Sequence, residues 1–177
     1  MPTSSSGIGK ILGGTVLAFF EANLALTDPV PAFDFFDNIN QIYSRQLLLP
    51  STKVRGTQVQ RAIIADGCII TDAHIKRSVI RIRSVIESGT TIHNSVLMGA
   101  GFYQAEAWEP KPDAPPLGIG RHCHIEGAII DKNARIGEGV VITPNGKPAN
   151  MDVENYCIRD DVDVVTKGAV IPNGTSI

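Results

Sequence analysis

The sequence has few cysteines, no long apolar run and no excess of charge of either sign. Its three cysteines, Cys68, Cys123 and Cys157, are far apart and form no C-x-x-C pair. This spacing argues against a disulfide framework or a cysteine zinc site and favours a reducing compartment, in which each cysteine is a small buried residue. No apolar run approaches the roughly 18 residues that a membrane-spanning helix needs. Charged residues make up 19% of the chain and the net charge is −2, so we expect neither nucleic acid nor a membrane as a partner.

The start of the chain lacks the apolar segment of a signal peptide. Residues 1–14 are mostly polar and small, and we interpret them as a linker or a cloning remnant. The length of 177 residues fits one domain with a short appendage.

A short helix is predicted within "GTVLAFFEANLAL", residues 14–26, because apolar residues recur there at three- and four-residue spacing. Thr15 can cap its start, and the prolines at 29 and 31 impose an extended path after it. An isolated helix of this length is marginal in water. We therefore expect the helix and connector, residues 15–52, to dock on another surface. The connector carries the aromatic residues Phe33, Phe35, Phe36 and Tyr43.

From residue 53 onward, aliphatic residues recur every five or six positions, a period that fits neither a helix nor a half-buried strand. Such hexapeptide repeats form short strands, each with one aliphatic side chain inside and a tight turn after it. Three of them close one triangular coil of about 18 residues. The pattern predicts an all-β domain, a parallel β-helix of about five to six coils over residues 53–177. Its expected inward residues are Ile64, Ile70, Ile86, Ile92, Ile130, Ile136 and Ile171.

Two insertions interrupt the repeats, near residues 99–118 and 143–156. Loops that break a regular solenoid are frequent binding sites, although each could also be a simple solvated excursion.

Candidate chemical groups outside the repeat core are few. His122 and His124 could share one face of a strand, but no third metal ligand has a suitable spacing, and we predict no metal site. Arg81 and Arg83, in "RIR", are expected on one face of a strand, either as solvated charges or as part of an anion site.

Several segments together resemble the carboxyl-terminal part of the ADP-glucose pyrophosphorylase (glucose-1-phosphate adenylyltransferase) family, collinearly from about residue 15 to the end. They are "FFEANLALT", "LLLPSTKV", "RSVIESGTTIHNSVLMGAGFY", "GIGRHCHIEGAIIDKNARIG" and "GAVIPNGTSI". The resemblance implies a left-handed β-helix that serves subunit contacts and allosteric control in a tetrameric enzyme of the bacterial cytoplasm or the plastid stroma. That enzyme converts ATP, with Mg²⁺, and glucose 1-phosphate to ADP-glucose and pyrophosphate, in glycogen or starch synthesis.

The chain departs from the family pattern because it has no Gly-rich nucleotide loop and no sugar-phosphate motifs. We therefore expect a fragment with no catalytic residues and no cofactor of its own, which forms a homo-oligomer. A smaller departure is Arg81, where the family often has glycine.

The resemblance also implies an effector site. In activator-responsive members, two lysines of this domain bind effectors such as 3-phosphoglycerate, phosphate or sulfate, and they map to Lys132 in "IIDKNARIG" and Lys167 in "VTKGAVI". We expect Lys132 and Arg135 to project outward near a coil corner, with Arg83 as a further anion-binding candidate. The alternatives are that these are solvated surface charges, that the chain is a free-standing hexapeptide acyltransferase, or that it is a purely structural β-helix.

Overall fold

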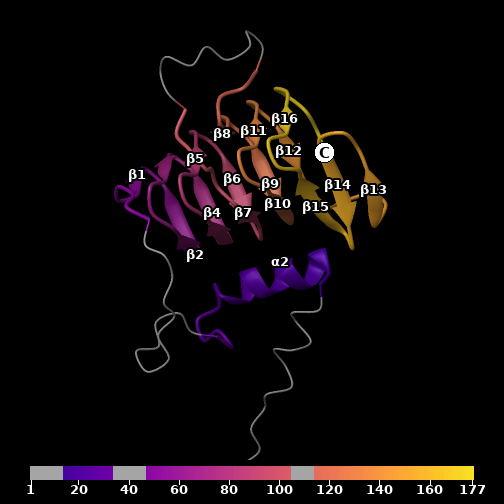
Figure 1. Cartoon of the computed structure of the whole chain (residues 1–177), viewed down its shortest axis with the longest axis horizontal. Coiled ribbons are helices and arrows are strands. Elements are labelled where there is room, and N and C mark those ends of the chain that lie inside the picture. Colours follow the sequence, from indigo (N-terminus) through magenta and orange to yellow (C-terminus); the bar gives the residue numbers. More distant parts are fainter. Residues whose placement is uncertain (1–13, 34–46, 105–113) are drawn as a thin grey trace, which may run out of the picture.

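The computed structural model describes residues 14–33, 47–104 and 114–177 (Figure 1). Most of these residues form one stack of short strands, with a single helix along its outside. Residues 1–13, which we interpreted as a linker or a cloning remnant together with Gly14, lie outside the described ranges. The aromatic residues Phe35, Phe36 and Tyr43 of the connector also lie outside them.

The helix α2 spans Val16–Ala25. It begins where the sequence predicts, because the side chain of Thr15 accepts a hydrogen bond from the backbone N–H of Ala18 at 3.1 Å. After the helix, Asp28 forms an ion pair with Arg61, which ties the connector to the first coil.

The strands form parallel stacks on three sides, and neighbouring strands in a stack come from successive coils. On the first side the order is β1 (Lys53–Arg55), β3 (Ile69–Thr71), β5 (Val85–Ile86), β8 (Gly118–Ile119), β11 (Arg135–Ile136) and β16 (Val170–Ile171). These six levels agree with the coil number expected from the repeats.

The other two sides share two long strands that bend at a corner. Strands β2 (Gln58–Ile64) and β4 (His74–Ile80) turn at Arg61 and Arg77, which have φ values of 53° and 46°. Their first halves stack with β6 (Thr91–His93), β9 (His124–Glu126) and β12 (Val141–Ile142). Their second halves stack with β7 (Val96–Leu97), β10 (Ala128–Ile130) and β15 (Val162–Val165).

The core is a column of aliphatic side chains inside the coils. Ile70, Ile86, Ile119, Ile136 and Ile171 follow one another in register on the first side, and all are buried. This arrangement confirms the prediction from the repeats. Every isoleucine expected to point inward lies in the core or packs against it: Ile64, Ile70, Ile86, Ile92, Ile130, Ile136 and Ile171.

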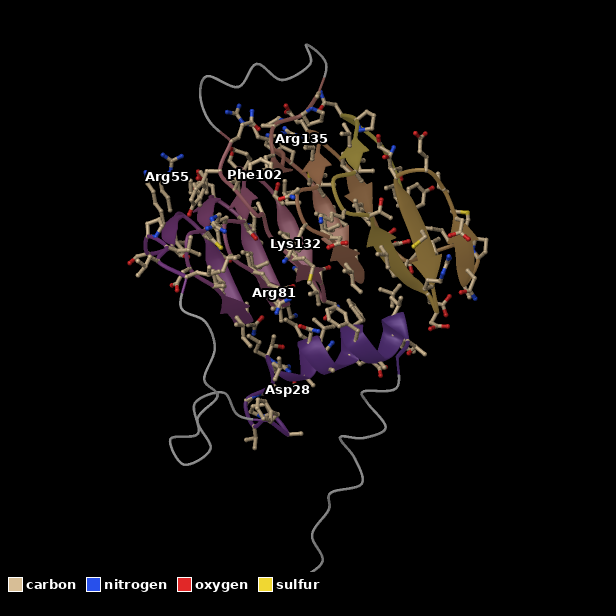
Figure 2. All side chains as sticks on the ribbon, viewed as in Figure 1. Asp28, Arg55, Arg81, Phe102, Lys132 and Arg135 are labelled. Carbon is tan, nitrogen blue, oxygen red and sulfur yellow. The ribbon has the colours of Figure 1, made fainter. Side chains whose placement is uncertain are left out.

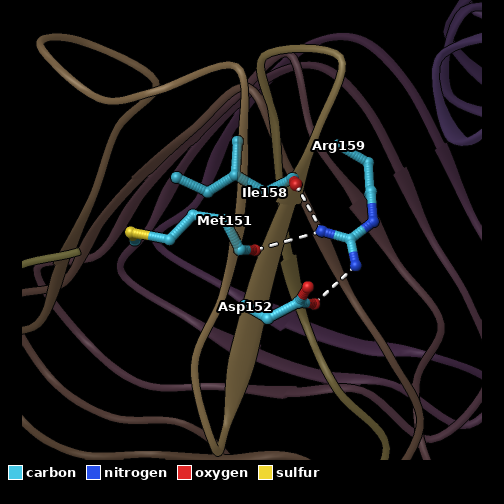
Figure 3. A network of polar contacts seen from close by, with 4 residues as sticks. All are labelled: Met151, Asp152, Ile158 and Arg159. Atoms are coloured by element: carbon cyan, nitrogen blue, oxygen red, sulfur yellow. Dashed lines mark hydrogen bonds and ion pairs between the residues drawn. The ribbon is translucent and has the colours of Figure 1, made fainter.

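The two insertions have different structures. The first leaves the stack after Leu97 and returns at Gly118, and its residues 105–113 lie outside the described ranges. The second was expected as a loop, but it contains β13 (Asn150–Asp152), which pairs antiparallel with β14 (Tyr156–Arg159), and β14 pairs antiparallel with β15. The guanidinium of Arg159 holds this hairpin, because it donates to the carbonyls of Met151 and Ile158 and pairs with Asp152 (Figure 3).

Helix α2 covers the outer face of the third side. Leu24 is buried in a cluster with Val79, Val96, Ile129 and Val162, the outward residues of four successive coils. Leu17 and Phe19 of the same helix are 36% and 41% exposed.

The amino-terminal end of the stack is open among the described residues. The first coil points Val54 and Val59 inward, in register with Ile70 and Ile75. Yet Val54 and Val59 are 49% and 46% exposed, whereas Ile70 and Ile75 are 1% and 2% exposed.

Two smaller findings concern the composition-based expectations. Cys68 and Cys123 are buried as expected, but Cys157 in β14 is half-exposed. No helix among the described residues is long and apolar enough to cross a membrane.

Candidate anion-binding site

Lys132 and Lys167 occupy equivalent positions in two neighbouring coils. Ile130 lies opposite Val165 before the turn, and Arg135 lies opposite Val170 after it. Because the same register holds on both sides, Lys132 lies opposite Lys167, and the backbone N–H of Gly168 donates to the carbonyl of Lys132 at 2.9 Å. Stacked strands are about 4.8 Å apart, so the two lysines leave one corner as near neighbours.

Both lysine side chains are exposed. Within the described ranges neither takes part in an ion pair. The adjacent Asp131 directs its Oδ1 to its own turn, where it accepts the backbone N–H of Lys132 at 2.6 Å. Two like charges at the coil spacing repel each other, and an anion between them would relieve that repulsion.

Arg83 lies on the same corner, two coils before Lys132. It was expected on a strand with Arg81, but β4 ends at Ile80 and both arginines lie in the following turn, where Arg83 has a φ of 57°. Its guanidinium lies 5.7 Å from the ring centroid of Tyr103, a cation–π contact with the start of the first insertion.

The sequence suggested that Arg135 projects outward beside Lys132. In the structure the Arg135 side chain is buried instead, and it lies apart from Lys132 (Figure 2). It is only 8% exposed, and burial lowers the pKa of its guanidinium. Its Nη1 donates to the carbonyl of Pro115 at 2.9 Å and to Oε1 of Gln104 at 3.1 Å. Gln104 and Pro115, near the two ends of the first insertion, therefore cover the group that was expected to meet solvent.

Sequence reasoning missed the residues that tie the first insertion to this corner. The side-chain Oδ1 of Asn133 accepts the backbone N–H of Gly101 at 2.8 Å, and the hydroxyl of Tyr103 donates to the carbonyl of Gly67 at 2.9 Å. Asn133 has a φ of 62°, at a turn position that Gly67 and Gly168 occupy in other coils. An asparagine in place of a glycine indicates a positive φ, but nothing in the sequence identifies Gly101 as its partner.

The histidines lie elsewhere. His122 is in a turn with a φ of 54°, and His124 is the first residue of β9, with its Nε2 3.6 Å from Glu126. Among the described residues, no group of three His, Cys, Asp or Glu side chains has a geometry that could hold a metal ion.

Comparison with known families identifies the fold. A family model described as the GLGC left-handed parallel beta-helix domain matches residues 47–176. The chain belongs to this family. Membership gives the coil its hand, which the repeat period could not: the GLGC β-helix is left-handed, against the usual right-handed crossover.

A curated relative of this GLGC-family chain is the glucose-1-phosphate adenylyltransferase small subunit, chloroplastic/amyloplastic, of Triticum aestivum. The two are 40% identical over 170 residues, which cover 93% of this chain and 36% of the wheat protein. The chain thus spans about a third of the relative's length.

Proposed function

We propose that this chain is a regulatory and oligomerisation domain of a glucose-1-phosphate adenylyltransferase. The observation that carries the proposal is the stacking of Lys132 on Lys167, exposed and in register, at one corner of the GLGC-type β-helix. The name of the wheat relative supports a role in ADP-glucose formation, and hence in starch or glycogen synthesis, and a location in the plastid stroma. ATP and its Mg²⁺ would be bound by a nucleotidyltransferase domain rather than by these residues.

The proposed effectors are phosphorylated anions: 3-phosphoglycerate, phosphate or sulfate. Two ammonium groups on flexible stems suit the capture of a phosphate oxygen cluster, because each supplies three donors and a full charge. Arg83 extends the positive corner by two coils, and Tyr103 orients its guanidinium. Arg135 would act through its charge and its contacts with the insertion, since its donors already serve Gln104 and Pro115.

The test is direct binding of 3-phosphoglycerate to the whole chain, followed by NMR. Lys132→Ala and Lys167→Ala should each raise the dissociation constant about tenfold or more, as expected for loss of a charged hydrogen bond of about 1.5–3 kcal/mol. Lys53→Ala is the control, since Lys53 is exposed in β1, which lies four strands before β11 in the stack. If the three variants bind like the parent chain, the lysines are solvated surface charges and the proposal is wrong.

The oligomerisation part of the proposal depends on the open end of the stack. Val54 and Val59 lack the covering layer that buries their counterparts in the next coil. Exposed inward-facing side chains and unpaired edge strands invite association, and tetramer formation by the intact enzyme would bury them.

A further inference from the structure

The turn that carries Lys132 also contacts both ends of the first insertion. We define the first stalk as residues 99–104, where the chain leaves the coils, and the second stalk as residues 114–118, where it returns. Residues 131–134 form the turn between β10 and β11. Lys132 is exposed on this turn. Asn133, in the same turn, and Arg135, the first residue of β11, contact the stalks.

Asn133 contacts the first stalk. Its Oδ1 accepts the backbone N–H of Gly101 at 2.8 Å, and its own backbone N–H donates to the carbonyl of Gly99 at 3.0 Å. A side-chain bond and a main-chain bond from one residue therefore fix the stalk against the turn.

Arg135 joins the two stalks to each other. Its Nη1 donates to Oε1 of Gln104 in the first stalk and to the carbonyl of Pro115 in the second. The same Gln104 oxygen accepts the backbone N–H of Leu117 at 2.8 Å. Because Arg135 is buried, these polar groups have little access to water, so loss of a bond would leave them poorly satisfied.

The backbone of the turn has little freedom to absorb a displacement. The next coil holds it from one side, since Gly168 N–H donates to the carbonyl of Lys132 and Arg135 N–H donates to the carbonyl of Ala169 at 2.8 Å. The first stalk holds it from the other side through Asn133. Hydrogen bonds on both sides therefore connect the turn that carries Lys132 to the first stalk and to the next coil.

We propose that Asn133 and Arg135 are positioning residues that couple anion capture at Lys132 to the placement of the two insertion stalks. This inference rests on the proposed anion site. It adds that anion binding at the lysines changes the placement of the two stalks, and that this change is the regulatory effect. Coupling of this kind is reciprocal, so fixed stalks strengthen anion binding and a bound anion protects the stalks. The "KNAR" sequence thus combines one residue that meets the anion with two that hold the insertion.

The experiment measures phosphate affinity and amide exchange by NMR on the whole chain. The amides of Gly101 and Leu117 are the reporters, because each donates to a side chain of the coupled group. In the parent chain, inorganic phosphate should slow the exchange of both amides. Lys132→Ala should abolish that slowing.

Two variants break the coupling without removing a charge near the anion. Arg135→Lys keeps the charge, but its shorter side chain ends before the position of the Nη1 that donates to both Gln104 and Pro115. Asn133→Gly keeps the positive φ but loses the acceptor for Gly101. Each should weaken phosphate binding about fivefold or more, within the usual range of coupling energies, and should speed exchange of the stalk amides.

Matched controls exist at another corner. Arg121→Lys changes an exposed turn arginine in the same way, and Asn173→Gly removes an asparagine Oδ1 that accepts the N–H of Glu138 at 2.8 Å. Both should bind phosphate within about twofold of the parent chain, well below the coupling range.

The outcomes separate the two proposals. If the parent chain binds no phosphate, the proposed function fails and the coupling fails with it. If Lys132→Ala abolishes binding while Arg135→Lys and Asn133→Gly bind like the parent, the anion site stands and the coupling is overturned. Should Arg135→Lys unfold the chain, as judged by circular dichroism, Asn133→Gly in its exposed turn decides the question.

Discussion

At the scale of single residues, Asp163 is a buried acid in a fold whose core is mostly isoleucine. Asp163 is fully buried at a corner position where the preceding coil has Ala128. Its Oδ2 lies 2.5 Å from the ammonium of Lys147, and its Oδ1 has no hydrogen-bond partner among the described groups. A buried carboxylate with one partner is costly to desolvate, so Lys147 keeps the second insertion against the end of the stack.

This acid predicts an unusual pH dependence. Burial raises the pKa of Asp163 above its ordinary value of 3.8, although Lys147 pulls it down. The native state therefore keeps the proton to higher pH than the unfolded chain, and its contribution to stability is lost as pH rises through that window. Relative to Asp163→Asn, the parent chain should lose unfolding free energy as pH rises above the ordinary pKa of 3.8.

Urea unfolding at a series of pH values checks this expectation, with Asp161→Asn at the exposed hairpin tip as the control. A relative gain in stability of the parent chain as pH rises would contradict it.

A second residue-scale prediction concerns the core column. Ile136 is fully buried between Ile119 and Ile171. Ile136→Ala should lower the free energy of unfolding by about 2–5 kcal/mol, because the stacked coils cannot close over the cavity. Val141→Ala, on an exposed outward position, should cost far less. Equal losses in the two variants, measured by urea unfolding, would contradict the inward assignment.

At the scale of elements, substitutions in α2 test which residues hold this helix against the coils. Leu24 is buried against the outward residues of the third side, whereas Leu17 is 36% exposed. Leu24→Ala should cost about 2–5 kcal/mol of stability, and Leu17→Ala much less, since only the first change opens a cavity. Thermal unfolding of the two variants gives the comparison, and a larger shift for Leu17→Ala would show that the docked face is misassigned.

Elements that obey a local rule could be predicted from the sequence. The six-residue period specifies which side chain enters the core, and Thr15 marks the start of α2 because its hydroxyl replaces a missing backbone partner. The contacts of Arg135 could not be predicted, because they depend on where an insertion some 20–30 residues away returns to the stack. The β13–β14 hairpin was missed for a related reason: its strands, such as "NMD", are too short and polar to show a period.

At the scale of the whole molecule, the exposed first coil predicts self-association. Val54 and Val59 would be buried if a second copy or another subunit covered the open end. Light scattering should show a mass above that of one chain at high concentration, and Val59→Lys, which places a charge on that end, should reduce it. A strictly monomeric parent chain at every concentration would contradict this prediction.

The second whole-molecule prediction concerns catalysis. The sequence carries no Gly-rich nucleotide loop or sugar-phosphate motif, so this chain alone should form no ADP-glucose. A radiometric assay with ATP, Mg²⁺ and glucose 1-phosphate should stay at background, and the same assay of a chain joined to a nucleotidyltransferase domain serves as the control. Turnover that follows the protein peak through purification would refute the prediction.

The course of α2 along the stack also has a consequence for biosynthesis. The helix contacts β4, β7 and β15 (Figure 1), so its docking surface is complete only when β15 has formed. A ribosome adding about 5–20 residues per second needs roughly seven to thirty seconds to pass from Val16 to Val165. Throughout that interval Phe20 and Leu24 lack part of their cover, and closing such a distant contact is slow. Among the described elements, α2 is therefore the first to be synthesised, yet its full burial waits for β15.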